Sequence, residues 1–495
     1  KGGLTTPFFW NVAPNQNLIL RPTFSAMHAP LVVGDYMGRF AQWFVNLQAS
    51  GTRDADGVNQ GHVRSTFGYD MTDRWRLTGQ VFRVKEDTYF RRYDIPRINE
   101  NLPFLTTAAA AERFGDQNYF SLAGYNFQNL RFDVDNDTIP DVIPVMSYQY
   151  MTKPLTSFGL TAWTQVHGSS FMTDQDLESH RLSLVQGVRV PYVHGSGVVV
   201  DTSAFIRADG YRVDSGPYQF GRRAPDASYM TGRVFPVGSV EASYPLMKAG
   251  ADTRQVFEPV VMVVASPTNM NRRDIPNIDS LNFNFDDTNL FSVNRFSGYD
   301  QVETGTRANY GARWSLYDRD NKRIVSALFG QSYRLEESDE LTRLMGYDDH
   351  FSDYVGQLQV SHQNIFAGYR FRLSPDDLSA RKNELFINGG SDPLRLGLGY
   401  TMVKAYQIQN NAYPDREEIY LTLGSQLTRR FSVKGFYRYD LSDDGGPIAA
   451  GVAGRYENEC TALILDARKA FTSDRDYRGG FSIKFQFVLK TLGGT

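Results

Sequence analysis

Residues 481–489, Phe-Ser-Ile-Lys-Phe-Gln-Phe-Val-Leu, decide the fold class of this chain. Every second position from Phe481 to Phe487 is apolar, and the positions between them carry Ser482, Lys484 and Gln486. Successive side chains of a β-strand point to opposite faces, so this stretch predicts a strand with one apolar and one polar face.

The same alternation recurs along the chain, in residues 181–190, 307–316 and 432–441. The longest aliphatic run, residues 260–265, is far shorter than the roughly 18 apolar residues that a spanning helix requires. A bundle of membrane helices is therefore excluded. An antiparallel β-barrel with one lipid-facing and one wet face fits both the alternation and the polar overall composition.

A soluble sandwich or propeller also alternates, and other features favour the membrane. Aromatic residues make up 14% of the chain and cluster near expected strand ends, at Tyr89-Phe90, Tyr148–Tyr150 and Phe436–Tyr439. Interfacial girdles of a membrane barrel have this composition. No motif repeats at a fixed spacing of 20–50 residues, which argues against a propeller.

The connections look uneven in length, as they are at the two ends of an outer-membrane barrel. Residues 69–75 and 427–431 read as short turns, and residues 48–61, 101–118 and 266–301 as long connections. The Ala-rich stretch Thr106–Phe114 could form a short loop helix. No Pro/Ser-rich linker divides the chain, so residues 1–495 are expected to form a single domain.

Charge and motifs point away from nucleic acid and from catalysis. Fifty-two Lys and Arg against 55 Asp and Glu, with no basic block, argue against nucleic-acid binding. The seven His lack zinc-type spacing, and the acidic run Asp133–Asp137 lacks the Gly and Glu of a calcium loop. We therefore expect no catalytic residue, no metal and no cofactor. No signal peptide opens the chain, so we expect an upstream region to be missing.

Five segments in order resemble the LptD family, the lipopolysaccharide-assembly proteins. Each follows the family's pattern: Pro7–Asn15 with Leu18–Pro22, Ile275–Ser280 with Asn289–Phe291 and Asn294–Asp300, Gly330–Arg334, Ser352–Gly356, and Arg455–Cys460. The resemblance implies a large closed barrel of about 26 strands in the outer membrane. It also implies an LptE-type lipoprotein plug inside the barrel and an LptA-type periplasmic bridge. The bridge acts through an N-terminal jelly-roll domain that this chain lacks.

The function implied by the resemblance is a translocon that inserts lipopolysaccharide into the outer leaflet. Its lateral gate lies between the first strand, near Thr6–Ala13, and the last, near Phe481–Leu489. The expected gate residues are Pro7, Phe8, Trp10, Pro22, Phe481, Ile483, Phe485 and Phe487. Lys484 and Lys490 are expected to point inward along the substrate path. The alternative is a passive porin or a nutrient receptor of the outer membrane.

Two further expectations concern a loop and the one cysteine. The Asn- and Asp-rich segment from Asn269 to Tyr299 is expected to fold over or into the barrel mouth and touch the plug. Its candidate residues are Asp279, Asn289, Phe291, Arg295, Tyr299 and Asp300. Cys460 is expected to form a disulfide with the missing N-terminal domain, because a lone thiol in an oxidising compartment favours a partner elsewhere. Some family members carry paired cysteines where this chain has Glu459-Cys460, so their double-disulfide scheme cannot apply unchanged.

Overall fold

The computed structural model describes residues 3–25, 29–54, 56–93, 95–98, 102–174, 178–214, 228–280, 284–336, 347–348, 350–408, 411–473 and 479–489. These residues form strands almost throughout. In chain order the elements are β1 (Gly3–Thr5), β2 (Phe8–Ala13), β3 (Gln16–Ser25), β4 (Leu31–Arg39), β5 (Trp43–Arg53), β6 (Asn59–Asp70), β7 (Trp75–Val84), α1 (Tyr89–Arg92), β8 (Phe104–Phe114), β9 (Asn118–Asn129), η1 (Asn136–Thr138), β10 (Asp141–Met151), β11 (Thr161–Met172), β12 (Glu178–Val193), β13 (Val199–Asp214), β14 (Tyr229–Ser243), β15 (Leu246–Ala249), β16 (Arg254–Ala265), β17 (Arg307–Tyr317), β18 (Arg323–Arg334), β19 (Tyr347–Asp348), β20 (Phe351–Ser352), β21 (Tyr354–His362), β22 (Ile365–Leu373), β23 (Ala380–Ser391), β24 (Leu394–Val403), β25 (Tyr406–Ile408), β26 (Asn411–Tyr413), β27 (Arg416–Gln426), β28 (Phe431–Asp440), β29 (Gly446–Glu457), β30 (Thr461–Ala470) and β31 (Phe481–Leu489).

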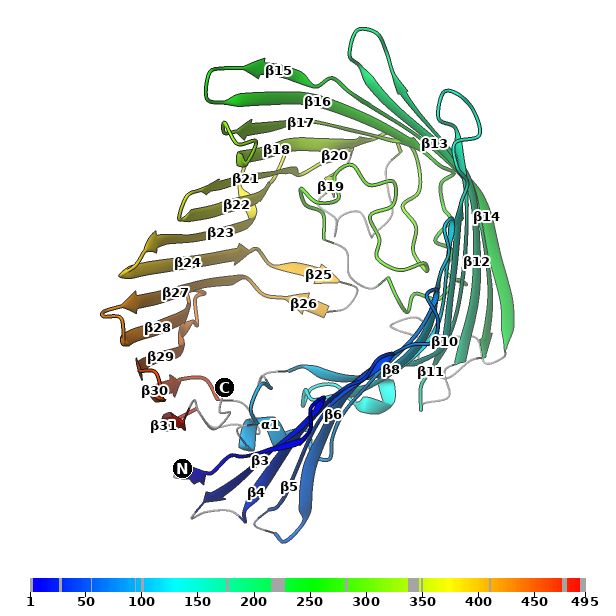
Figure 1. Ribbon diagram of the computed structural model, residues 1–495. Helices are drawn as coiled ribbons and strands as arrows, with labels where there is room; N and C mark the ends of the chain where they lie inside the picture. Colours follow the sequence, from blue (N-terminus) through cyan, green and yellow to red (C-terminus); the bar gives the residue numbers. More distant parts are fainter. Residues whose placement is uncertain are drawn as a thin grey trace.

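The expected all-β antiparallel class is confirmed. Twenty-nine strands belong to one sheet, which curls around a central space (Figure 1). Three strands of the wall are each interrupted, and their pieces are β1/β2, β14/β15 and β20/β21. The two pieces of each pair with the same neighbouring strand, so they count as one wall strand. The number of wall strands is therefore close to the expected 26. Among the described residues, no ladder joins β31 to β1, β2 or β3. No helix of the described part is long and apolar enough to cross a membrane.

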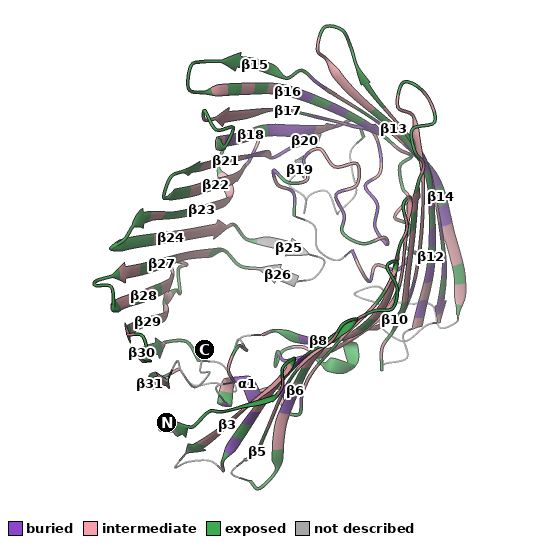
Figure 2. Ribbon diagram, viewed as in Figure 1, coloured by how far each residue is buried: buried purple, intermediate pink, exposed green. Residues whose placement is uncertain are grey.

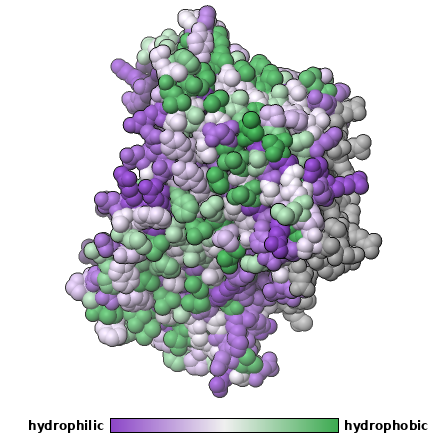
Figure 3. Space-filling view, turned by 90° about the vertical axis from the view of Figure 1, so that its right-hand side faces the viewer, coloured by the Kyte–Doolittle hydropathy of each residue, from purple (hydrophilic) through white to green (hydrophobic). Residues whose placement is uncertain are grey.

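The two faces of the sheet show an inverted distribution of polarity. On β12, Arg181 and Ser183 are buried, whereas Leu182 is 56% and Leu184 45% exposed. On β12 and β13, polar residues of the inner face are thus covered, whereas apolar residues of the outer face are uncovered (Figure 2). Hydrophobic patches on the outside of the wall are visible in Figure 3. A water-soluble protein buries its apolar residues, so this outer face is built to contact lipid.

The ends of the wall differ in the length of their connections. Residues 71–74 and 427–430 form short turns, which confirms the two short turns predicted there. The long connection 266–306 is also confirmed. The predicted long connection at 48–61 is wrong, because β5 and β6 extend through most of it and leave only residues 54–58 as a loop.

The prediction for residues 101–118 is wrong as well. Thr106–Phe114 is not a helix but part of strand β8, which pairs with β7 and β9. Alanine favours a helix in isolation, but here the backbone bonds to strands on both sides outweigh that preference.

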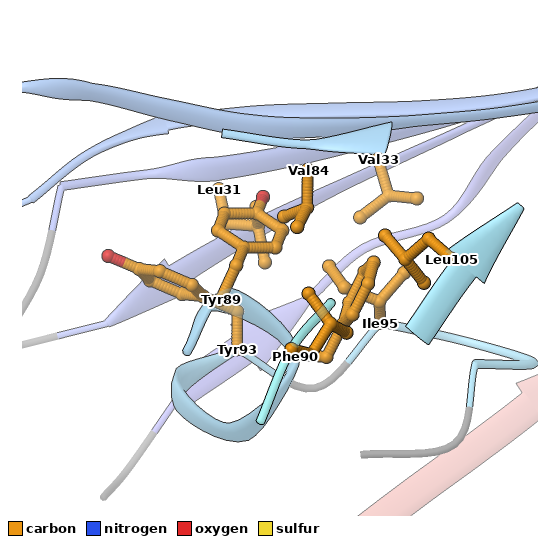
Figure 4. Close-up of a cluster of buried hydrophobic side chains, with 9 residues drawn as sticks. Leu31, Val33, Val84, Tyr89, Phe90, Tyr93, Ile95 and Leu105 are labelled. Atoms are coloured by element: carbon orange, nitrogen blue, oxygen red, sulfur yellow. The ribbon is translucent and has the colours of Figure 1, made fainter. Parts of the chain in front are cut away.

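Two connections fold back onto the inner wall. Residues 85–103, including α1, carry Tyr89, Phe90 and Ile95 into an apolar cluster with Val33 and Leu105 (Figure 4). Tyr89 and Phe90 are 0% and 4% exposed, so their expected place in an interfacial girdle is wrong. Residues 266–306 likewise cover the inner face of β11 to β18, and we call this segment the inner loop.

Candidate functional site at the seam and the inner wall

The first candidate site is the seam, where the first and last strands form the two edges of the sheet. The last strand, β31, has the expected bounds and pairs with β30. The first strand is interrupted: β1 ends at Thr5, and β2 begins at Phe8 instead of the expected Thr6. Both pieces pair with β3, with Thr5 opposite Thr23 and Phe8 opposite Leu20.

Both prolines lie at this interruption. The N–H of Thr6 donates to the carbonyl of Pro22 at 3.1 Å. In such an antiparallel pair the second residue normally donates its own N–H back to the first. Pro22 has no N–H, so this second hydrogen bond is missing. Backbone polar groups of successive strand residues point to opposite neighbours. Since Thr6 bonds towards β3, the nitrogen of Pro7 faces the free edge. Pro22 thus removes a donor from the first hairpin, and Pro7 removes one from the seam.

Apolar side chains are exposed on both edges of the sheet, including the four residues of β31 that were expected to face outward. Phe8 and Trp10 are 60% and 54% exposed. Phe485 is 67% exposed and stands opposite Leu465, itself 52% exposed, so both lie on the lipid side. Phe481, Ile483 and Phe487 share this face.

The inward positions of β31 alternate with these residues. Lys484 stands opposite Asp466 of β30 in the ladder. Two residues of opposite charge at such a position attract each other. Lys490 lies outside the described residues.

The second candidate site is the inner loop, and Tyr299 is its anchor on the wall. The ring of Tyr299 stacks on His167 of β11 with 4.0 Å between centroids. The guanidinium groups of Arg181 and Arg207 lie 5.1 and 5.3 Å from the same centroid. The Tyr299 carbonyl accepts hydrogen bonds from Arg207 and Arg233. These contacts bind the loop to four neighbouring strands, β11 to β14.

Asp279 and Asp300 share the buried guanidinium of Arg181. Its Nη1 lies 2.5 Å from Asp300 Oδ1 and 2.9 Å from Asp279 Oδ2. Burial raises the pKa of Asp300 to about 6, despite the pull of Arg181. Burial acts in the same direction on Asp279, but Arg181 and the N–H groups of Tyr299 and Asp300 hold the pKa of that carboxyl below its ordinary value. One cation therefore clamps two points of the loop.

Gly298 makes the clamp possible. It adopts a φ of +73°, and a Cβ there would lie 2.5 Å from the backbone oxygen of Asp279. A non-glycine residue would meet both the backbone strain and the clash.

A second cluster of charges lies under the other half of the loop. Glu303, wholly buried, is ion-paired with three arginines: Arg295 (3.2 Å), Arg334 (3.1 Å) and Arg307 (3.4 Å). Burial alone would raise the pKa of Glu303, but the three guanidinium groups keep it below its ordinary value. Backbone carbonyls take up part of the excess positive charge, among them Ser292 with Arg307 at 3.0 Å and Leu290 with Arg295 at 3.1 Å.

The other two candidate loop residues have smaller roles. Asn289 holds a local turn, because its side chain donates to the carbonyl of Asn284 and accepts from the N–H of Asp286. Phe291 packs against two apolar clusters of the wall and lies 4.9 Å below the guanidinium of Arg313.

A hollow of about 980 Å³ opens between the inner loop and the wall. Aromatic rings of Trp163 and Phe291 line it beside the polar side chains of Gln165, Arg189 and Asp201. The hollow beside the loop therefore offers both apolar and polar groups and is large enough to admit a segment of a partner or substrate.

One group of side chains could hold a metal ion. Ligand atoms of Glu178, His180 and Asp214 lie within 4.8 Å of one another on β12 and β13. His180 already binds Glu178 at 2.8 Å and Ser170 at 2.7 Å through its two ring nitrogens. The ion pairing explains the cluster without a metal. Cys460 is an exposed free thiol in the turn between β29 and β30.

The sequence analysis did not identify the wall residues that bind the inner loop. Arg181 is 119 residues from Asp300, and Arg207 and Arg233 are 92 and 66 residues from Tyr299. The available signal was the arginine at an inward position of β12, β13 and β14.

Comparison with known proteins settles the family. A model of the LptD family, "LPS transport system D", matches residues 59–431. The chain belongs to the LptD family. The LPS-assembly protein LptD of Haemophilus influenzae strain 86-028NP is 22% identical, over 95% of this chain and 63% of the relative. The LptD protein of Vibrio cholerae is also 22% identical, over 88% of this chain and 58% of its own length.

This LptD-family chain thus spans about three fifths of the length of these curated relatives. Among solved structures, the siderophore receptor PirA from Pseudomonas aeruginosa aligns with a TM-score of 0.37 and 9% identity, covering 98% of this chain and 80% of that one. That likeness is too low to carry an argument. Family membership and the apolar outer face of an antiparallel sheet place the chain in the outer membrane.

Proposed function

We propose that this chain is the membrane-spanning part of a translocon that inserts lipopolysaccharide into the outer leaflet through a lateral gate. The observation that carries the proposal is the pair of prolines at the interrupted first strand of an LptD-family sheet. Each missing backbone bond forgoes about 1 kcal/mol of net stabilisation. A seam that must open repeatedly gains from being the weakest junction of the wall.

The two-faced wall suits an amphiphile. The sugars of lipopolysaccharide are costly to transfer into hydrocarbon, and its acyl chains are costly to transfer into water. A polar interior accommodates the sugars while the acyl chains pass between β2 and β31. The outward side chains Phe8, Trp10 and Phe485 keep the lipid side of the closed seam apolar. No covalent step is involved.

The partners follow the same scheme. An LptE-type lipoprotein occupies the interior and contacts the inner loop, beside the hollow at Trp163 and Gln165. An LptA-type bridge delivers lipopolysaccharide to an N-terminal jelly-roll domain. Cys460, exposed in the β29–β30 turn, forms a disulfide with that domain. A shift of the full-length protein on reduction in a non-reducing gel supports this bond, and free alkylation of Cys460 in the mature protein contradicts it.

Depletion of the protein in growing cells tests the function. Newly made lipopolysaccharide should then fail to reach the cell surface, as measured by surface labelling, while periplasmic levels rise. A passive porin or nutrient receptor predicts reduced solute uptake with normal lipopolysaccharide at the surface. Copurification of a tightly held lipoprotein separates the same alternatives.

A further inference from the structure

Positive charge gathers on the inner face at the short-turn end of β24 to β29. A hollow of about 780 Å³ opens there, and we call it the rim hollow. Its cationic lining residues are Arg395, Arg429, Arg430, Lys434 and Arg455. Three carboxylates share the lining: Asp392, Glu457 and Glu459. The rim hollow therefore carries an excess of two positive charges in a protein whose net charge is −3.

Existing ion pairs account for only part of this charge. Arg455 lies 2.7 Å from Glu457, and Arg395 lies 3.7 Å from Asp392. Within the described residues, no ion pair to a carboxylate is recorded for Arg429, Arg430 or Lys434. Three cations line one hollow and Glu459 is the one further carboxylate of its lining, so the site favours an anionic ligand, and guanidinium groups in particular suit phosphate oxygens.

The register connects the rim hollow with the seam. One row of inward residues crosses the last strands, each directly opposite the next: Arg395, Gly424, Lys434, Ala453, Asp466 and Lys484. Lys434 and Lys484 are three strands apart, or about 14 Å at the usual strand spacing. Gly424 and Ala453 are small, so the space over the row between the longer side chains stays open.

We propose that the rim hollow binds the phosphate groups of an anionic glycolipid headgroup before the lipid reaches the seam. This proposal rests on the translocon function and specifies one step of it. An anion held by Arg429, Arg430 and Lys434 lies on the inner face, one row of residues from Lys484 at the edge. The acyl chains can then enter the seam while the phosphates remain in the polar interior.

The experiment measures lipid binding by the full-length protein purified with its partner in detergent. The test variant is Arg429→Gln/Arg430→Gln/Lys434→Gln. The matched control, Arg319→Gln/Lys322→Gln/Arg323→Gln, removes the same charge around the β17–β18 turn, at the same end of the sheet. The probes are intact lipopolysaccharide, lipopolysaccharide after phosphatase treatment, and inorganic pyrophosphate. Heat-modifiable migration in gels verifies that each variant is folded.

We expect the test variant to bind intact lipopolysaccharide about tenfold more weakly, or about 1.4 kcal/mol, and the control to match the wild type. Binding of the phosphatase-treated lipid should be weak and equal in all three proteins. An equal loss in the control variant, or an equal loss for the phosphatase-treated lipid, overturns the proposal. Pyrophosphate that binds as tightly as the intact lipid identifies free phosphate as the ligand and overturns the headgroup assignment.

The test is independent of the gate. Binding is measured without export, so a protein that exports normally with its seam crosslinked disproves the gate and leaves the binding difference intact. If the protein exports normally through an open seam but substitution of the three cations does not change lipid binding, the translocon function stands. The proposed role of the rim hollow is then disproved.

Discussion

At the scale of single residues, Asp300 is the group whose protonation should change with pH in the working range. Burial raises its pKa to about 6, above the roughly 3.9 of an unfolded aspartate. Protonation therefore favours the packed loop. This contribution is fully present below about pH 4 and is lost as pH rises through 6. The pKa of Asp279 is lowered, so it adds no change between pH 5 and 8.

Asp300→Asn should accordingly remove this contribution. Between pH 5 and 8 the packed loop of the wild type should lose about 1.4 kcal/mol relative to the Asp300→Asn loop, or roughly tenfold in the ratio of packed to released loop. Protease cleavage within residues 266–306 of both proteins, followed across this pH range, measures the ratio. A loop whose protection changes with pH equally in both proteins contradicts the assignment to Asp300.

Gly298→Ala should release the same loop at every pH. The positive φ and the approach to Asp279 together should cost about 2 kcal/mol or more. Gly210→Ala on β13 is the matched control, because nothing lies within 4 Å of its Cβ position. Faster cleavage of the loop in Gly298→Ala alone is the expected result. Equal protection in both variants indicates that the turn can relax.

The residue scale also shows how far sequence reasoning reaches. Asp279, Arg295 and Asp300 were singled out because they lie in a segment that resembles the family. Their partners on the wall were not: Arg181, for example, lies 119 residues from Asp300 along the chain. Alternation indicates that a strand residue faces inward, but it contains no information on which loop will cover it.

At the scale of elements, alternation predicted strands well and loops poorly. The period of two is a backbone property of a strand, so β12 and β31 could be read directly. The inward folding of residues 85–103 depends on apolar contacts with β4, β7 and β8, which no local pattern contains. For β8 the local pattern predicted a helix where the structure has a strand. Alanines favour a helix in isolation, but the pairing of β8 with β7 and β9 decides its structure.

The inner loop as an element should depend on Glu303. Glu303→Gln removes the buried carboxylate that pairs with three guanidinium groups, a change that typically costs about 3–5 kcal/mol. The loop should detach, as seen by rapid proteolysis. Glu418→Gln is the control, because its partners Arg416 and Arg438 lie on β27 and β28, outside the part of the wall that the inner loop covers. A loop that stays protected in Glu303→Gln shows that the carbonyl contacts suffice.

The first hairpin should become more stable when its donors are restored. Pro22→Ala returns one N–H to the β2–β3 ladder, and Pro7→Ala returns one to the seam edge. Each bond should add about 1 kcal/mol. The double variant should raise the temperature of heat-modifiable migration and slow lipopolysaccharide delivery. Pro236→Ala in β14, remote from the seam, should leave delivery unchanged. Faster delivery in the double variant contradicts the gate.

At the scale of the whole molecule, the fold class was predictable and the closure was not. A polar inner and an apolar outer face follow from the alternation of every strand, and the structure confirms them. The expected count of about 26 strands came from the family resemblance, because composition does not determine how many strands a sheet contains. The pairing of the two edges is a contact between the ends of the chain, which no local pattern records.

The proposed gate is a property of the whole molecule, because it lies between the two edges of one continuous sheet. If the acyl chains leave between β2 and β31, a bond across these strands should stop delivery without unfolding the wall. A cysteine at Phe8 or Trp10, combined with a cysteine at a facing position of β31, can be joined by a short thiol crosslinker. The matched control is Leu465→Cys/Phe485→Cys, which stand opposite each other on β30 and β31 and lie on the same outer face.

Crosslinking the seam pair should block the arrival of lipopolysaccharide at the surface, whereas crosslinking the control pair should not, because β30 and β31 remain paired throughout. A cleavable crosslinker should restore delivery on reduction, which separates a closed gate from a damaged protein. Normal delivery through a fully crosslinked seam would end the lateral route and leave only passage through the open end of the wall.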